Sequence, residues 1–129
     1  MNQAIELHDS ELSGVSFIDD SAVVSLSPAY VHRFWEAPGS DTHSGWLQPA
    51  TLTFIGAALV PVPTSLPVWV SDGFLRIDSV LHNNLIPASG TFEGPVEFSV
   101  VLATAEQLTI RAMRVSIQLH GEASYIEDV

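Results

Sequence analysis

The chain has 129 residues, no cysteine, and 15 acidic residues against four basic ones, which gives a formal net charge of −11. All four basic residues are arginine, so chemistry that needs a lysine Schiff base or a phosphate-binding P-loop lysine is excluded. We expect no binding to nucleic acid or to anionic membrane surfaces, because both depend on cationic side chains. Without cysteine there are no disulfides and no thiolate metal sites.

The first third of the chain predicts short strands separated by turn residues. The expected strands are residues 4–7, 15–18, 22–26 and 30–34. Asp19-Asp20-Ser21 predicts the tight turn of a hairpin between the second and third of them, because these residues tolerate turn conformations. Pro28 interrupts the pattern, so residues 30–34 either continue the third strand past a bulge or form a separate edge strand.

The middle of the chain alternates between loops and strands. A loop is expected over residues 35–45, a strand over 47–60 that bends at Gly56, and two short strands over 68–70 and 74–80. Prolines between residues 61 and 67 keep the next segment extended but poor at ladder pairing. Ser71-Asp72-Gly73 predicts a hairpin turn between the two short strands. Residues 82–94, rich in asparagine, proline and glycine, predict an irregular segment.

The strongest signal is the alternation of apolar and polar residues from Val96 to Leu119, with a turn at residues 104–107. Successive side chains of a strand point to opposite faces, so a period of two indicates strands with one buried face. The expected inward residues are Val96, Phe98, Val100, Leu102, Leu108, Ile110, Met113, Val115, Ile117 and Leu119. No segment shows the three-and-four spacing of an amphipathic helix. A short strand around Tyr125-Ile126 and an acidic tail follow.

These patterns predict one all-β domain over residues 1–129, an antiparallel β-sandwich or flattened β-barrel of about eight or nine strands. Hydrophobic residues make up 47% and charged residues only 15% of the chain, whereas about 25% is ordinary for charged residues. We therefore expect leftover apolar surface that pairs subunits, with the run Phe54–Val62 as the interface of a homodimer or larger homo-oligomer.

The N-terminal residues lack the basic start and apolar run of a signal peptide, and we expect a cytoplasmic protein. The most apolar segment, residues 54–60, ends at Pro61 and is far shorter than the roughly 20 residues of a membrane helix.

Five histidines are the main candidates for chemistry: His8, His32, His43, His82 and His120. None has the spacing of a metal-binding motif, so no metal and no other cofactor is expected. If a functional centre exists, His8, Asp9 and His32 should converge, because both segments leave regular strand pairing at those points. Separate local hydrogen bonds for each histidine are the competing expectation, and Asp9 and Ser10 would then simply end the first strand.

The segment from Trp35 to Trp46 could instead hold a ligand. Two tryptophans that bracket polar residues, His43 among them, could stack on a sugar or another flat molecule. Alternatively, both rings turn inward and close one end of the domain.

Short motifs along the chain resemble the landmarks of a family of small bacterial all-β proteins with no established activity. The motifs are His8-Asp9-Ser10, Tyr30-Val31-His32-Arg33, Gly45-Trp46-Leu47-Gln48, Asn84-Leu85-Ile86-Pro87 and Gly121-Glu122-Ala123-Ser124-Tyr125-Ile126-Glu127. The resemblance spans nearly the whole chain and implies a compact, bacterial, cytoplasmic β-domain. If the landmarks mark a site, the positions to watch are His8, Asp9, His32, Gln48 and Asn84.

Three hypotheses for function follow. The first is a non-catalytic module that binds a small ligand or a protein and acts as a homo-oligomer. The second is a metal-assisted hydrolase that uses His8, Asp9 and His32, and the third is a carbohydrate-binding module that uses Trp35 and Trp46. The candidate ligand-binding residues are His8, Asp9, His32, Trp35, His43, Trp46, Gln48 and Asn84.

Overall fold

The computed structural model describes residues 1–35 and 43–129, and every regular element in them is a β-strand. The strands are β1 (Asn2–Glu6), β2 (Glu11–Ile18), β3 (Ser21–Phe34), β4 (His43–Ile55), β5 (Val68–Ile77), β6 (Val80–Asn83), β7 (Leu85–Pro87), β8 (Gly90–Leu102), β9 (Gln107–Leu119) and β10 (Ser124–Asp128). None of these residues forms a helix long and apolar enough to cross a membrane. The all-β prediction is confirmed.

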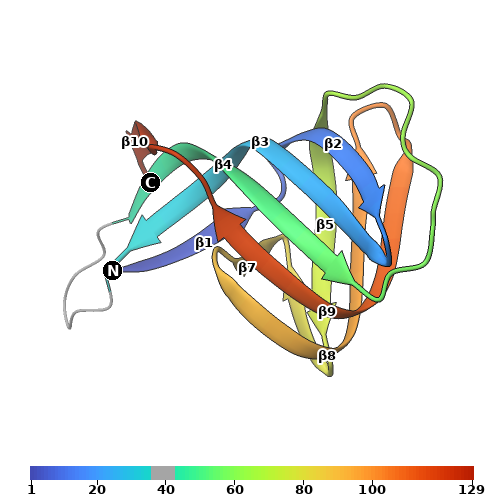
Figure 1. Cartoon of the computed structure of the whole chain (residues 1–129). Coiled ribbons are helices and arrows are strands. Elements are labelled where there is room, and N and C mark those ends of the chain that lie inside the picture. The colour runs from blue at the N-terminus through green and yellow to red at the C-terminus, as the bar shows by residue number, and fades with distance from the viewer. Residues whose placement is uncertain (36–42) are drawn as a thin grey trace.

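Six antiparallel strands close into a barrel in the order β3-β4-β9-β8-β5-β2, with β2 returning to β3 (Figure 1). The ring is closed unevenly. The β3–β4 pairing runs nearly the whole length of both strands, whereas β2 meets β5 only through Glu11↔Trp69 and Leu12↔Val68. One further backbone hydrogen bond, from Val70 N–H to the Ser10 carbonyl at 2.9 Å, completes this narrow seam.

Strands β3 and β4 are longer than the barrel and continue beyond it as a second, open sheet. Their outer halves, residues 29–34 and 43–48, pair with β1 and β10, and β1 pairs with β7. We call this five-stranded sheet, in the order β7-β1-β3-β4-β10, the extension sheet; it occupies the left of Figure 1, where both chain ends lie.

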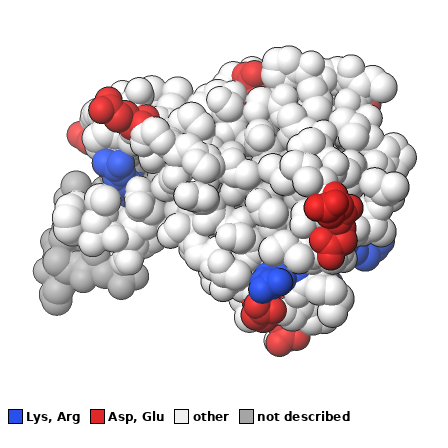
Figure 2. Space-filling view, viewed as in Figure 1, with Lys and Arg blue, Asp and Glu red and all other residues white. Residues whose placement is uncertain are grey.

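The outer surface carries few charges for its size. In Figure 2 the charged side chains form a few small groups and most of the visible face is uncharged. Large apolar side chains that remain exposed include Leu59, Trp69, Val80, Leu81 and Met113.

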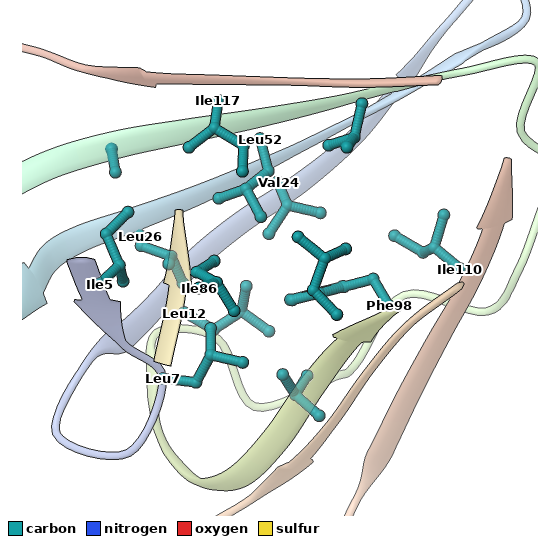
Figure 3. Packing of buried hydrophobic residues seen from close by; sticks show 14 of the residues in the cluster. Ile5, Leu7, Leu12, Val24, Leu26, Leu52, Ile86, Phe98, Ile110 and Ile117 are labelled. Atoms are coloured by element: carbon teal, nitrogen blue, oxygen red, sulfur yellow. The ribbon is translucent and has the colours of Figure 1, made fainter. Parts of the chain in front are cut away.

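The core fills the barrel and reaches the base of the extension sheet (Figure 3). Phe98, Val100, Leu102, Val115 and Ile117 are all buried, as the alternating pattern predicted. Leu119 is only partly buried, but it packs against the core. Phe54 and Phe98 meet in the barrel interior with ring centroids 5.2 Å apart, so the two halves of the barrel interdigitate there.

The hairpin predicted at residues 71–73 is wrong. Strand β5 runs unbroken from Val68 to Ile77, and the register merely shifts between Val70 and Asp72. Gly73 is needed for close packing, because a Cβ there would lie 2.8 Å from the Ser99 carbonyl oxygen of β8. Asp72 accepts a hydrogen bond from the Gly73 N–H, so turn-type residues here shape a bulge inside a strand.

One other expected strand boundary shifts, and one side chain faces the other way. Strand β4 ends at Ile55, because Gly56 adopts a φ of +74° and both Gly56 and Ala57 donate their N–H groups to the Asp20 carbonyl. Met113 was expected to point inward but is 62% exposed, and Ala112 takes the buried position. The cause is a register shift between β8 and β9 next to this point, where the side-chain alternation changes phase.

The segment 82–94 is more regular than its composition predicted, since it contributes to β6, all of β7 and the start of β8. Residues 30–34 do continue β3 past a bulge between Leu26 and Ala29. The predicted loop after Trp35 ends earlier than expected, because β4 begins at His43; residues 36–42 lie outside the described part of the chain. The proposed interface run is partly internal, because Phe54 is fully buried while Leu59 and Val62 are exposed.

Candidate functional site

One face of the extension sheet gathers most of the polar residues that the sequence singled out. Directly paired residues of neighbouring strands project from the same face. The pairs on this face, which we call the site face, are Ala4↔His32, Glu6↔Tyr30, Phe34↔His43 and Glu6↔Leu85.

A pocket of about 330 Å³ opens on the site face. Its lining residues come from four strands and are Ala4, His32, Phe34, His43 and Leu85. The walls are almost entirely apolar, and the rings of Phe34 and His43 lie against each other with centroids 5.6 Å apart. The volume lies at the lower end of the range for small-molecule sites.

The turn after β1 holds His8 and Asp9 beside this face. The Ser10 N–H donates to the Leu7 carbonyl at 3.1 Å, and Asp9 has a φ of +77°, a left-handed conformation that aspartate tolerates better than most residues. The Ser10 hydroxyl, fully buried, donates to the Glu6 carbonyl at 2.6 Å and accepts from the Tyr30 N–H at 2.9 Å. Ser10 therefore fixes the turn on β3 and is not a free nucleophile.

Asn84 fixes the same turn from the other side. Its side-chain oxygen accepts the His8 N–H at 2.8 Å, and its backbone carbonyl accepts the Leu7 N–H at 2.8 Å. Asn84 itself has a φ of +66°, which asparagine adopts more readily than most side chains. The predicted site residue Asn84 is thus a positioning residue for the turn.

Four titratable side chains form a chain of contacts across the turn and β3. His8 Nδ1 lies 3.5 Å from Asp9 Oδ1, an Asp9 carboxyl oxygen lies within 4.8 Å of one from Glu6, and Glu6 Oε2 lies 3.6 Å from His32 Nε2. The Nε2 atom of His32 is buried and has no hydrogen-bond partner among the described residues. Burial raises the pKa of Glu6, the hydrogen bond and negative charge of Asp9 raise it further, and His32 opposes the shift.

Tyr30 connects this chain to β10. Its hydroxyl donates to Glu127 Oε1 at 2.8 Å, and its ring meets that of His32 edge-on at 5.0 Å. Burial, the Glu127 hydrogen bond and the charges of Glu127, Glu6 and Asp9 raise the pKa of Tyr30 to about 12, so its hydroxyl stays protonated. Gly45 leaves room for this hydroxyl, because a Cβ at that position would collide with it.

The same region offers ligand atoms for a metal ion. Glu6, His8 and Asp9 each provide one nitrogen or oxygen atom, and these atoms lie within 4.8 Å of one another. Two carboxylates and an imidazole suit divalent ions such as Zn²⁺ or Mn²⁺. His32 lies outside this group. Of the trio expected to converge, His8 and Asp9 lie side by side, and His32 reaches them only through Glu6.

Trp46 and Gln48 lie away from the pocket. The Arg33 guanidinium lies 4.0 Å from the Trp46 ring centroid, the Tyr125 ring is 5.4 Å away, and the indole N–H donates to Ser44 Oγ. Gln48 is buried and donates to the Gly121 carbonyl at 3.0 Å, so it anchors the connection from β9 to β10. Trp35 directly follows the last residue of β3 and is 53% exposed.

Several residues of the site were not singled out from the sequence. They are Ala4, Glu6, Tyr30, Phe34, Leu85 and Glu127. A period of two was available as a signal, because Tyr30, His32 and Phe34 must share one face of an extended strand. Which of the 15 acidic residues would meet that face could not be read from spacing, because Glu6 and Glu127 arrive from opposite ends of the chain.

No protein-family model, no curated protein and no solved structure matches the chain.

Proposed function

We propose that this protein is a non-catalytic module that binds a small ligand in the pocket of the site face. The observation that carries the proposal is the pocket itself, with its apolar walls and two imidazole rings at one end of a closed barrel. Sites for small ligands are mostly apolar, with a few polar groups that fix orientation. His32, backed by Glu6, supplies such a group here.

Binding without chemistry fits the described residues best. Ser10, in the turn beside the site face, is fully buried, and its hydroxyl bonds the Glu6 carbonyl and the Tyr30 N–H. The raised pKa of Tyr30 keeps its hydroxyl protonated, and this hydroxyl already donates to Glu127. Neither group is free to act as a nucleophile, which supports a role in binding.

A fragment titration tests this function. Small aromatic molecules added to isotope-labelled protein should shift the NMR signals of Phe34, His43 and Leu85, with those of the distant barrel residue Thr109 unmoved. A bulky side chain at the pocket wall, Ala4→Leu, should abolish the shifts. The matched control Glu93→Gln changes an exposed barrel carboxylate and should leave them intact. Binding that is indifferent to Ala4→Leu contradicts the proposal.

A metal-assisted hydrolase is the second candidate, favoured by the ligand atoms that Glu6, His8 and Asp9 bring within 4.8 Å of one another. Calorimetric titration of Zn²⁺ into chelator-treated protein tests it. We expect one binding site that His8→Ala removes, whereas His120→Ala, a histidine bonded to Thr51 on the barrel, retains it. Zinc binding unaffected by His8→Ala eliminates this candidate.

The homo-oligomer is retained as part of the proposal. Leu59, Trp69 and Met113 support it, since each leaves a large apolar side chain in water. An obligate interface buries roughly 2,000 Å² or more. Sedimentation at micromolar concentration should show a species larger than 13.9 kDa, and a clean monomer removes this part of the proposal.

A further inference from the structure

The charge around the pocket is one-sided. Glu6, Asp9 and Glu127 all lie close enough to the Tyr30 hydroxyl to raise its pKa. The chain has no lysine. Arg33 lies on the same strand as Tyr30, but its side chain is held on the opposite face by Gln3 and Trp46.

The other three arginines lie on the barrel. Arg76 and Arg111 contact Glu97, and Arg114 contacts Glu93. The described part of the site face therefore combines carboxylates with imidazoles and presents no lysine or arginine side chain.

The carboxylate of Glu6 stands next to the pocket along two directions. On β1 it follows Ala4 by two residues, a step of about 6.6 to 6.8 Å on the same face. Across the sheet it is paired with Leu85, which lines the pocket, and it contacts His32, which also lines it. Glu6 does not line the pocket, but it lies directly beside two residues that do, Leu85 and His32, so its carboxylate borders the pocket.

We propose that the ligand is a small organic cation, an alkyl- or arylammonium whose apolar part fills the pocket and whose ammonium group meets Glu6. This inference rests on the proposed function and specifies its ligand. The Phe34 ring can add a cation–π contact. An anionic ligand meets repelling carboxylates and no lysine or arginine side chain on the described part of the face, and a bare metal ion leaves the apolar walls unused.

Three small aromatic compounds that differ in charge test the inference: benzylamine, benzyl alcohol and benzoate. Each is titrated at neutral pH and constant ionic strength, and the NMR shifts of Phe34, His43 and Leu85 are followed. We expect benzylamine to bind about tenfold more tightly than benzyl alcohol, because a hydrogen bond to a charged group adds this much to a neutral contact. Benzoate should bind most weakly.

Glu6→Gln should reduce benzylamine affinity to the level of benzyl alcohol and leave the alcohol unchanged. Glu93→Gln is the matched control and should change neither affinity. If Glu6→Gln fails to fold, Asp9→Asn replaces it, since asparagine tolerates the left-handed conformation at that position. It should weaken benzylamine about threefold and spare the alcohol.

The outcomes separate the two proposals. Equal affinities for the amine and the alcohol overturn the organic cation while the pocket remains a ligand site. If none of the three compounds binds, either to the unchanged protein or to Ala4→Leu, the proposed function is overturned as well. Zinc binding at His8 without amine binding at Phe34 also overturns the organic cation and favours the metal site.

Discussion

The barrel and the extension sheet share two strands but use them differently. Inside the barrel each strand turns one face to the core and the other to water, as Val115 and Ile117 alternate with Arg114 and Ser116. In the extension sheet both faces of β3 are engaged, with Tyr30, His32 and Phe34 on the site face and Arg33 over Trp46 on the other. A closed barrel hides its apolar face completely, whereas an open sheet must cover both faces with its own side chains, including polar ones.

The largest expected effect is a loss of stability in the barrel that the pocket does not show. Replacing the buried Ile117 with alanine should lower the free energy of unfolding by about 2–5 kcal/mol, from lost burial and an unfilled cavity. Phe34→Ala at the open pocket should cost less stability but abolish ligand binding. Urea unfolding of both variants, with fragment titration at low urea, makes the comparison. Equal stability losses would mean that the extension sheet is as much a core as the barrel.

Alanine substitutions at three glycines compare how closely the barrel and the extension sheet are packed. Gly73→Ala in the barrel presses a methyl group on the Ser99 carbonyl, which cannot move without its strand, and should cost about 1–3 kcal/mol. Gly45→Ala in the extension sheet collides with the Tyr30 hydroxyl, which can swing away and give up Glu127, so the loss should be smaller.

Gly14→Ala meets no atom within 4 Å and serves as the control, with an expected change within about ±0.5 kcal/mol. Thermal unfolding of the three variants gives the order. A Gly45 variant that is less stable than the Gly73 variant would contradict the view of the extension sheet as the softer region.

A smaller, pH-dependent effect should mark the extension sheet alone. Because the folded protein raises the pKa of Glu6, the native state binds this proton more tightly than the unfolded chain, and ionisation of Glu6 destabilises the fold above that pKa. Glu6→Gln should therefore increase stability at neutral pH. The gain should shrink as pH falls through the folded pKa and vanish below the unfolded one. Denaturation midpoints across this range test it, and a loss of stability at neutral pH would show that the His32 contact outweighs burial.

The smallest effect belongs to the ion pairs on the outer surface of the barrel. Arg111 contacts Glu97 at 2.9 Å but is 75% exposed, and such pairs contribute about 0.2–1 kcal/mol at most. Arg111→Ala and Glu93→Gln should each change the unfolding free energy by no more than this, and salt should reduce the difference. A loss comparable to that of Ile117→Ala would mean that these surface charges hold the barrel closed.

Alternation predicted the barrel well, because one face per strand is buried there. The hairpin at Asp19-Asp20 and the pair β8–β9 follow directly from period two and turn chemistry. It failed where tertiary packing uses turn residues inside strands, as at Asp72-Gly73, and where edge strands carry little periodicity, as in β6 and β7. Strand closure distinguishes a barrel from a sandwich, and it depends on the seam between β2 and β5, which no local pattern reveals.

Only part of the candidate site could be predicted from the sequence. His32 and His43 were named and both line the pocket, and His8 and Asp9 were named together. The partner that connects them, Glu6, could not be chosen from 15 acidic residues without the turn that Ser10 and Asn84 impose. Trp46 and Gln48 were conspicuous by residue type, but their partners Arg33, Tyr125 and Gly121 assign them to holding β10 and its approach in place.

The short seam between β2 and β5 is where we expect the six-stranded barrel to open first by local unfolding. Breaking two register pairs and the Val70–Ser10 bond opens it, so amide protons of Leu12 and Val70 should exchange with solvent by local opening while those of β8 and β9 wait for global unfolding. The Ser10 carbonyl accepts the hydrogen bond that completes the seam, and the Ser10 hydroxyl donates the hydrogen bond that fixes the turn. A ligand that holds the turn in place should therefore also slow amide exchange at the seam, at residues that the ligand does not contact.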